Sequence, residues 1–473
     1  MREKYESLSA TVLRDLAKSR GIKNTSTMKK ADLVEAMLAE DAKKEKEKAE
    51  KEPEKRQEQT NSTVKPERRK ADTSELAKEG TKEGEREDAS QDDTMKNLDS
   101  GITVNGILEV MQDGFGFIRS DNYLPGENDV YVSPSQIRRF NLKTGDIICG
   151  NTRIKTQQEK FSALLYITTI NGYQPGVIQQ RKNFEDLTPI FPNERIRLER
   201  PGSSVAMRIV DLISPIGKGQ RGMIVSQPKA GKTTLLKEVA KSVTASNPDM
   251  HLIILLIDER PEEVTDIREA IEGENVEVIY STFDELPEHH KRVSEMVIER
   301  AKRLVEHHKD VMILLDSITR LARAYNLTVP PSGRTLSGGL DPAALHMPKR
   351  FFGAARKMRE GGSLTILATA LVDTGSKMDD VVYEEFKGTG NMELVLDRKL
   401  SEKRVFPAID IVKSGTRRED LLLEPDELEA VEIMRKAYNG MRADEAVENI
   451  LNMFARTKNN KEYIAMVKKN RII

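Results

Sequence analysis

A short loop between an apolar strand and a helix constrains this chain more than any other feature of its sequence. Residues 226–234 read SQPKAGKTT, with an apolar run before them and the helical stretch LLKEVA after them. In such a loop Gly231 lets backbone N–H groups and the helix N-terminus face phosphate groups, Lys232 reaches the β- and γ-phosphates, and Thr233 offers its hydroxyl to Mg²⁺. Ser226 stands where the usual pattern has its first glycine. The loop nevertheless predicts a site for a nucleoside triphosphate.

The pattern around this loop predicts an α/β domain with a mainly parallel sheet. Apolar strand candidates alternate with helical stretches from about residue 205 to residue 423, which is typical of that fold class. The strand candidates are residues 223–225, 252–257, 276–280, 311–315, 364–368 and 405–411. Residues 425–468 have helical character, so we expect them to cap this domain.

Two of these strand candidates end in acidic residues. Residues 252–257 lead into Asp258 and Glu259, and residues 311–315 lead into Asp316. Asp316 is suited to hold Mg²⁺ or its water shell, and Glu259 is suited to polarise an attacking water. Acidic residues also cap strand exits without any chemical role. Their combination with a phosphate loop favours hydrolysis.

Two arginines, Arg404 and Arg417, lie far along the chain from the phosphate loop, near the last strand candidate. If subunits pack in a ring, Arg417 can reach the γ-phosphate bound by a neighbour, and such arginine fingers raise the rate by roughly 10³ to 10⁵. In an isolated monomer the same side chain would only be solvated. The residues alone leave both interpretations open.

Between residues 102 and 173 the pattern changes to five short alternating runs separated by Gly, Asn and Pro. Five short strands in so short a segment predict a small closed barrel.

One strand of this barrel carries an aromatic face. Phe115 and Phe117 are two residues apart and share a strand face with Arg119. Tyr131 and Phe161, on later strands, can extend that face. Bases of a single strand stack on such rings with roughly 1–3 kcal/mol each. Such rings also fill barrel cores, but the glycines around Phe115 and the cation at Arg119 favour exposure and hence nucleic-acid binding.

Two polar loops of the α/β domain contain glycine, residues 332–339 and residues 373–377. Both are explained by surface flexibility alone. In a ring, however, such loops can line a central hole, where Arg334 and Lys377 would contact the backbone phosphates of a threaded strand.

Composition limits what the rest of the chain can be. At roughly one domain per 100 to 200 residues, 473 residues predict about three folded units. The formal net charge of -1 means that local surfaces, and not a global positive field, must hold any polyanion. Residues 7–40 show helical spacing on both sides of Gly21, which predicts a small helical unit. Residues 41–97 are highly charged with both signs mixed, which predicts a disordered linker.

The start of the chain has no apolar stretch resembling a signal peptide, and the longest apolar runs are far too short to span a bilayer. The single cysteine, Cys149, excludes an internal disulfide. We therefore expect a soluble cytoplasmic protein without a membrane partner.

A series of ordered motifs identifies a family. GFGFIR, YVSPSQIRRFNL, PKAGKT, LLIDERPEEVT, LLDSITRLARAYN, KRFFGAARKM, DTGSKMDDVVYEEFKGTGNMEL and EKRVFPAID follow one another from about residue 102 almost to the C-terminus. In these motifs the chain closely resembles the bacterial transcription termination factor Rho family. The resemblance implies a homohexameric RNA helicase that hydrolyses ATP to ADP and phosphate, loads on nascent single-stranded RNA and releases it from RNA polymerase, with elongation factors as further partners.

The resemblance also implies a multidomain fold with a small N-terminal helical unit, an OB- or cold-shock-like β-barrel, and a RecA-like α/β ATPase domain with a helical C-terminus. We expect a helical module at 1–40, a disordered charged linker at 41–98, the RNA-binding barrel at 99–174, a connector at 175–204, the phosphate-loop ATPase domain at 205–424 and its helical C-terminal part at 425–473.

Site residues follow from the resemblance, position by position. The residues themselves assign catalytic roles to Lys232, Thr233 and Asp316, with Thr233 holding Mg²⁺ together with ATP, and the resemblance implies Glu259 as the catalytic carboxylate and Arg417 as the finger from the adjacent subunit. Nucleotide contacts fall on Gly217, Lys218, Gly219, Gln220, Arg221, Gly222, Lys229, Ala230, Gly231, Lys232, Thr233, Thr234 and Arg260. The primary RNA site comprises Gly114, Phe115, Gly116, Phe117, Ile118, Arg119, Asp129, Val130, Tyr131, Glu159, Lys160 and Phe161. The secondary RNA site comprises Thr335, Leu336, Ser337, Gly338, Gly339 and Lys377.

Departures from the family pattern are few. Phe161 stands where some relatives have Tyr, Arg334 stands where some have Lys, and the charged linker before Ile102 is unlike the compact relatives. The main rival interpretation is a rotary or transport-type hexameric ATPase that does not use RNA. A protein of that class would not need the aromatic face around Phe117.

Overall fold

The computed structural model describes residues 98–119, 122–156, 158–438 and 440–470, together with Lys30 and Val34. The predicted helical module at 1–40 and the predicted linker at 41–98 lie outside the described residues, apart from Lys30, Val34 and Leu98. Among the described helices, none is both long enough and apolar enough to cross a membrane.

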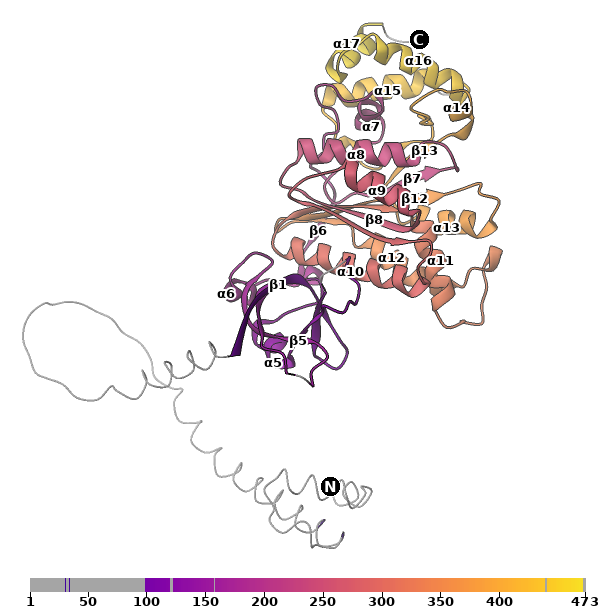
Figure 1. The fold of residues 1–473 in the computed structure, drawn as a ribbon. Coiled ribbons are helices and arrows are strands. Elements are labelled where there is room, and N and C mark those ends of the chain that lie inside the picture. The colour runs from indigo at the N-terminus through magenta and orange to yellow at the C-terminus, as the bar shows by residue number, and fades with distance from the viewer. Residues whose placement is uncertain are drawn as a thin grey trace, which may run out of the picture. The chain divides into compact units, whose positions relative to one another are not determined.

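The first described domain is a closed five-stranded barrel (Figure 1). Its strands pair in the order β1-β2-β3-β5-β4, and a short helix, α5 (Pro134–Phe140), follows β3. The strands are β1 (Asp99–Val110), β2 (Gly116–Arg119), β3 (Val130–Val132), β4 (Ile147–Arg153) and β5 (Ser162–Ile170). Alternate apolar residues such as Leu108, Ile118 and Ile148 fill the interior. The predicted small barrel is therefore confirmed.

A connector with little regular structure follows the barrel. It contains α6 (Pro175–Ile178), the 3₁₀ turn Phe184–Asp186 and β6 (Pro189–Ile190). The last of these pairs with β11 (Arg356–Met358), which joins the edge of β12 in the larger domain.

The larger domain is built on a mainly parallel sheet. Its main path runs β14-β13-β7-β12-β10-β8-β9, and β14 pairs antiparallel with β13. The strands of this path are β7 (Arg221–Ser226), β8 (His251–Glu259), β9 (Val276–Thr282), β10 (Asp310–Asp316), β12 (Ser363–Leu371), β13 (Met392–Leu396) and β14 (Gly415–Thr416).

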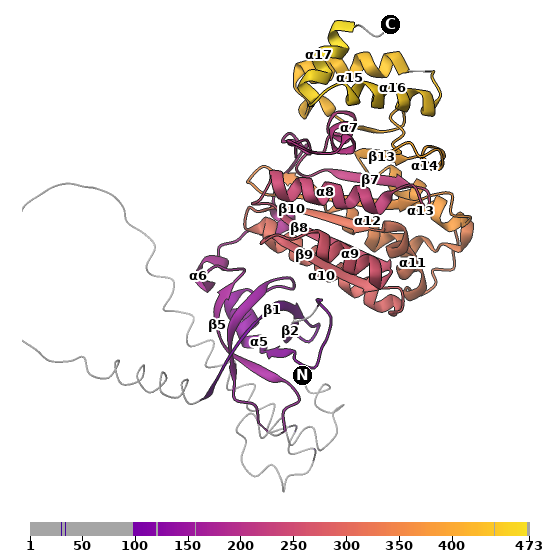
Figure 2. The ribbon, with the colours of Figure 1, turned by 45° about the horizontal axis from the view of Figure 1, so that its top comes forward.

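Helices cover both faces of this sheet (Figures 1 and 2). One face carries α7 (Val205–Ile213), α8 (Lys232–Ser246), α9 (Pro261–Ala270) and the C-terminal helices α15 (Pro425–Tyr438), α16 (Ala443–Ala455) and α17 (Asn460–Asn470). The other carries α10 (Pro287–Glu306), α11 (Ile318–Thr328), α12 (His346–Gly353) and α13 (Lys377–Lys387). Along β10, Met312 and Leu314 enter the first core and Ile313 and Leu315 the second, which is why the central strands read as continuous apolar runs.

One predicted strand is wrong. Residues 405–411 form no strand and make only an isolated bridge, Leu396 to Ile409, while the position next to β7 belongs to β13. Pro407 has no backbone N–H with which to join a ladder, and Ala408, Ile409 and Ile411 are buried in the core. The apolar pattern there reflects burial and not strand pairing.

Candidate nucleotide site and RNA-facing surfaces

The phosphate loop takes the shape that its residues predict. α8 begins at Lys232, directly after Gly231, whose φ is 92°. A Cβ at Gly231 would meet nothing within 4 Å, so the left-handed backbone, and not a lack of space, calls for glycine there. A pocket of about 530 Å³ opens above the N-terminus of α8, lined by the loop and by Thr233, Glu259 and Arg260.

The two predicted acids lie against the predicted lysine. Lys232 Nζ donates to Glu259 Oε1 at 3.0 Å and to Asp316 Oδ1 at 2.5 Å. Both carboxylates are buried, and Thr369 Oγ1 holds Asp316 with a further bond of 2.8 Å. Glu259 and Asp316 are 57 residues apart in the sequence. They meet because the neighbouring parallel strands β8 and β10 end at the same edge of the sheet.

The charges of this cluster determine its protonation. Burial alone would lower the pKa of Lys232, but the carboxylates of Asp316 and Glu259 outweigh it and raise that pKa, so the ammonium stays charged. Burial, and then the charge of Asp316, raise the pKa of Glu259 above its usual range. A carboxylate whose pKa moves toward neutrality is better matched to accepting a proton from water.

One arginine near these acids was not predicted from the sequence. Arg320, in the first turn of α11, lies 3.6 Å from Glu259 Oε2 and 3.6 Å from Asp258 Oδ2, and it lines the phosphate pocket. The segment SITR directly after Asp316 was the available signal, because a helix that begins at the end of β10 brings its first turn to the same edge.

An apolar pocket beside the phosphate loop was also missed. It measures about 310 Å³, shares Gly231 and Thr234 with the phosphate pocket, and includes Leu396, Phe406 and Pro407. The Phe406 ring is 52% exposed, unusual for so large an apolar side chain. The ring was overlooked because its segment was interpreted as a strand.

Residues 217–222 do not line the phosphate pocket. They lie before and at the start of β7, whereas the phosphate loop follows its other end. There Gly219 N donates to Thr365 Oγ1, and Gln220 Nε2 donates to Asn391 Oδ1. Gly217, Lys218, Gly219, Gln220, Arg221 and Gly222 therefore lie away from the phosphate pocket of their own chain, and their contact with a nucleotide stays a prediction. In a parallel sheet, the two ends of one strand cannot reach one site.

Arg417 lies at that same distant end of the sheet. Thr416 and Gly222 both pair with Met392 at the start of β13, while Ser226 pairs with Leu396 at its other end. Four residues of strand span roughly 13 Å, so Arg417 cannot reach phosphates bound by its own chain. Its side chain is exposed and lines a pocket of about 370 Å³ with Lys413 and Arg435.

The barrel gathers the four predicted rings into one cluster. Phe117 and Tyr131 are paired across β2 and β3, with ring centroids 6.0 Å apart. Phe115 lies 5.8 Å from each of these two rings, and Phe161 lies 5.1 Å from Phe117. All four are only partly buried, so each offers some ring surface to solvent.

The predicted exposure of Arg119 is wrong. Arg119 is 4% exposed, and its guanidinium donates to Glu109 Oε2 at 2.8 Å and to Asp129 and lies 4.8 Å from the Phe117 ring centroid. Two carboxylates compensate the buried cation, a requirement that strand alternation does not reveal. Ile118 and Val130 point into the barrel core.

The other polar members of the predicted primary site have local partners. Glu159 accepts a bond from Thr156 N at 3.0 Å and pairs with Arg153, and the Thr156 N–H is the first cause that lowers its pKa. Lys160 Nζ lies 5.2 Å from the Phe161 ring centroid, at the rim of the aromatic cluster. The four rings offer surface for stacking, and exposed Lys160 offers a cation for phosphate contact.

The structure brings the two predicted RNA loops together. A Cβ at Gly338 would lie 2.5 Å from Met378 N and 2.8 Å from the carbonyl carbon of Lys377, so only glycine fits. Gly339 O accepts a bond of 3.3 Å from Asn326 Nδ2 on α11. Thr335 and Lys377 are exposed beside this contact, whereas Leu336 is half-buried.

Comparison with known proteins agrees with this arrangement. The Rho termination factor RNA-binding domain matches residues 104–176, the Rho termination factor N-terminal domain matches residues 4–46, and the nucleotide-binding domain of the ATP synthase alpha/beta family matches residues 206–416. The fold of the larger domain is similar to that of an ATPase from the type III secretion system of pathogenic bacteria, with a TM-score of 0.50 at 21% identity over 61% of this chain and 89% of that chain.

Whole-chain relatives are more informative. Transcription termination factor Rho of Pseudomonas aeruginosa is 58% identical over 79% of this chain and 90% of its own length. The Rho factors of Salmonella typhimurium and Bacillus subtilis are 57% and 56% identical, over 77% and 76% of this chain and 88% and 83% of their own lengths. With an ATP-binding domain, an RNA-binding barrel and this degree of identity, the chain belongs to the transcription termination factor Rho family.

Proposed function

We propose that this protein is a cytoplasmic, RNA-dependent ATPase that moves along nascent single-stranded RNA and ends transcription by releasing the transcript from RNA polymerase. The observation that carries the proposal is the pairing of a hydrolytic cluster with a base-stacking surface in one chain. Lys232, Glu259 and Asp316 form the first, and the rings around Phe117 form the second.

The nucleotide is held by groups that the pocket already orients. Its phosphates lie at the N-terminus of α8, where free backbone N–H groups and Lys232 meet them. Its base enters the apolar pocket and stacks on Phe406. Thr233 and Asp316 supply oxygen donors, the ligands that Mg²⁺ prefers. Bound there with the nucleotide, Mg²⁺ would neutralise charge developing on the phosphates. The described residues contain no group of three or more His, Cys, Asp or Glu side chains that could hold a metal by itself, so its remaining ligands are phosphate and water.

Hydrolysis follows from an exchange of partners at Lys232. The ammonium leaves the carboxylates of Glu259 and Asp316 for the β- and γ-phosphate oxygens, which are the stronger concentration of negative charge. Glu259 is then free to orient the water that attacks the γ-phosphorus and to accept its proton, while the bond from that phosphorus to the β–γ bridging oxygen breaks and ADP leaves with the electron pair. Arg320, already beside Glu259, stabilises the negative charge that develops on the phosphate oxygens.

Assembly into a ring completes the site. Arg417 lies too far from its own phosphate loop to act there, so we propose that it reaches the phosphates of an adjacent subunit in a homohexamer. The paired loops at Gly338 and Lys377 then line the central hole, where exposed Lys377 contacts the RNA backbone.

The test is ATP turnover with and without cytosine-rich single-stranded RNA, in the wild type and in Phe117→Ala. Turnover of the wild type should rise at least about tenfold with RNA. Loss of one stacking ring removes roughly 1–3 kcal/mol of binding, so Phe117→Ala should need about 5- to 150-fold more RNA for half-maximal stimulation.

Tyr166→Ala is the matched control for that variant. Tyr166 is another exposed ring of the barrel, on β5, but it bonds Asp99 and does not belong to the aromatic cluster. Its replacement should leave the half-maximal RNA concentration within about twofold. A wild type that hydrolyses ATP equally well without RNA would sink the proposal and support an RNA-independent ATPase instead.

A further inference from the structure

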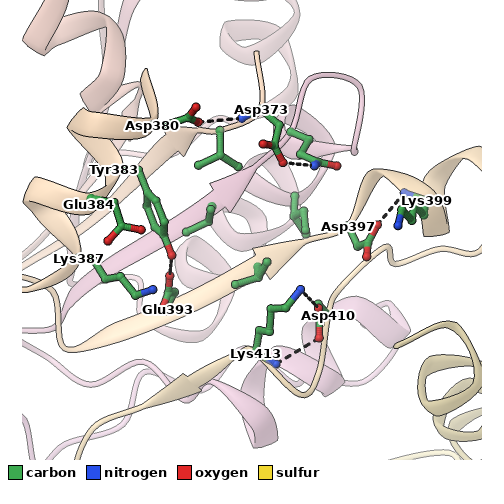
Figure 3. Close-up of a pocket in the computed structure, with 15 residues that line it drawn as sticks. Asp373, Asp380, Tyr383, Glu384, Lys387, Glu393, Asp397, Lys399, Asp410 and Lys413 are labelled. Carbon is green, nitrogen blue, oxygen red and sulfur yellow. Dashed lines mark hydrogen bonds and ion pairs between the residues drawn. The ribbon is translucent and has the colours of Figure 1, made fainter. Parts of the chain in front are cut away.

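Gln227 is the first residue after β7 and the second of the phosphate loop, and it lines the phosphate pocket. Its half-buried side chain lines a separate cavity of about 630 Å³ between the ends of β7, β12 and β13 (Figure 3). One wall of that cavity is α13, the helix that begins at Lys377. A residue of the nucleotide site therefore borders the element that carries the RNA loop.

The Gln227 amide bonds to two different segments. Its Nε2 donates to Asp373 Oδ2 at 2.5 Å, a bond drawn at Asp373 in Figure 3, and its Oε1 accepts from Arg398 N at 3.2 Å. Arg398 begins α14 (Arg398–Glu402), whose Ser401 Oγ also donates to Lys229 O in the phosphate loop. The donor and the acceptor of one side chain thus tie the phosphate loop to Asp373 and to α14.

Asp373 is the first residue of the loop 373–377, which we call the Lys377 loop. It has a left-handed φ of 50°, and its N–H donates to Asp380 Oδ1 at 3.1 Å. The preceding backbone is joined to the end of β7 by Val372 N to Ser226 O, at 3.2 Å. The phosphate loop and the Lys377 loop are therefore neighbours, and Gln227 supplies the side-chain link between them.

The far end of the Lys377 loop is held by other groups. Thr374 Oγ1 donates to buried Asp379 Oδ2 at 2.6 Å, and Arg323 of α11 holds the other oxygen of Asp379 at 2.7 Å. Gly338 packs against the backbone after Lys377. Because side chains hold the loop at both ends, a displacement applied at Asp373 is transmitted through residues 374–376 to Lys377 and its contact with Gly338.

We propose that Gln227 is a positioning residue that couples nucleotide binding at the phosphate loop to the RNA-contacting Lys377 loop. The inference rests on the proposed function and specifies how the binding of RNA and the binding of nucleotide affect each other. A shift of the phosphate loop toward bound phosphates moves Asp373 through the Gln227 amide. By thermodynamic reciprocity, RNA that holds Lys377 in the shifted position strengthens nucleotide binding by the same factor.

The test reverses the polarity of this one bond. Gln227→Glu keeps an acceptor for Arg398 N but places a carboxylate against that of Asp373, which turns the bond into a repulsion. The measured quantity is the ratio of RNA-stimulated to basal ATP turnover in the full-length protein, with saturating cytosine-rich RNA. We expect this ratio to fall about tenfold or more. Adding Asp373→Asn supplies an amide donor opposite the new carboxylate, and the ratio should return to within about threefold of the wild type.

Asp380→Asn, added to Gln227→Glu, is the matched control. It removes the same charge from the same wall of the cavity, but no bond joins Asp380 to Gln227. This pair should stay as impaired as Gln227→Glu alone. An unchanged ratio in Gln227→Glu, no recovery with Asp373→Asn, or equal recovery with Asp380→Asn would each overturn the coupling role. A wild type without RNA stimulation would overturn the proposed function itself, and is measured first.

Discussion

Replacing Lys232 by alanine is expected to lower ATP turnover by at least roughly 10³-fold, because one cation both binds the β- and γ-phosphates and holds the acids of the site. Without it, Glu259 and Asp316, 3% and 1% exposed, retain Arg320, 3.6 Å from Glu259 Oε2, as a compensating cation. Two buried carboxylates that share one cation take up a proton more readily, and a protonated Glu259 cannot accept another from water.

RNA binding by the barrel should survive this change. The ring cluster around Phe117 lies on β2 and the residue before it, on β3 and on the segment before β5, and none of its ring contacts involves the phosphate loop. Binding of a labelled cytosine-rich oligonucleotide should therefore stay within about threefold of the wild type. Loss of both turnover and RNA binding in a folded variant would show that binding and catalysis are not separate.

Lys237→Ala controls for the loss of a lysine from the same helix. Lys237 lies on α8 and pairs with the exposed carboxylate of Asp266 at 2.7 Å. Surface ion pairs of this kind contribute little to stability, so turnover should change by less than about twofold.

Replacing Arg417 by alanine should lower turnover by roughly 10³ to 10⁵, although the residue touches no part of its own phosphate loop. Arg418→Ala is the matched control, because Arg418 is the next residue and its exposed guanidinium bonds Asp420 at 3.0 Å. Its loss should leave turnover within about twofold.

Mixing two inactive variants tests whether Arg417 acts on a neighbour. A ring assembled from equal amounts of Arg417→Ala and Lys232→Ala subunits contains interfaces where an intact Lys232 meets an intact Arg417. With random assembly about a quarter of the interfaces are of this kind, so turnover should recover to at most about a quarter of the wild type. No recovery in demonstrably mixed rings would exclude a role across the interface.

The sequence predicted most of this architecture for identifiable reasons. Barrel strands were recognisable because inward apolar residues, such as Leu108, Ile118 and Ile148, alternate with outward residues along each strand. Strands β8 and β10 were recognisable as continuous apolar runs because both of their faces are buried. The phosphate loop was predictable because phosphate binding needs a left-handed turn, which glycine adopts at position 231, and a lysine at the start of the following helix. Glu259 and Asp316 followed, since parallel strands end at one edge.

What could not be predicted depends on long-range packing. The burial of Arg119 requires Glu109 and Asp129 to converge from β1 and from the segment before β3, and no local pattern encodes that meeting. The local apolar pattern around Phe406 is that of a strand, and only the tertiary structure shows that its ring lies beside the phosphate loop. Gly217 to Gly222 precede the phosphate loop by few residues, yet the length of β7 puts them at the opposite end of the sheet.

The central claim is that ATP hydrolysis drives movement along RNA, and strand displacement measures it most directly. The substrate is a labelled DNA strand annealed to an RNA that carries a long cytosine-rich single-stranded extension, prepared with the extension on either side of the duplex. We predict that the wild type releases the DNA strand only when ATP is present, for one placement of the extension, and that Lys232→Ala releases none. RNA-stimulated ATP turnover without release from either substrate would contradict the account, because the protein would then hydrolyse ATP on RNA without moving.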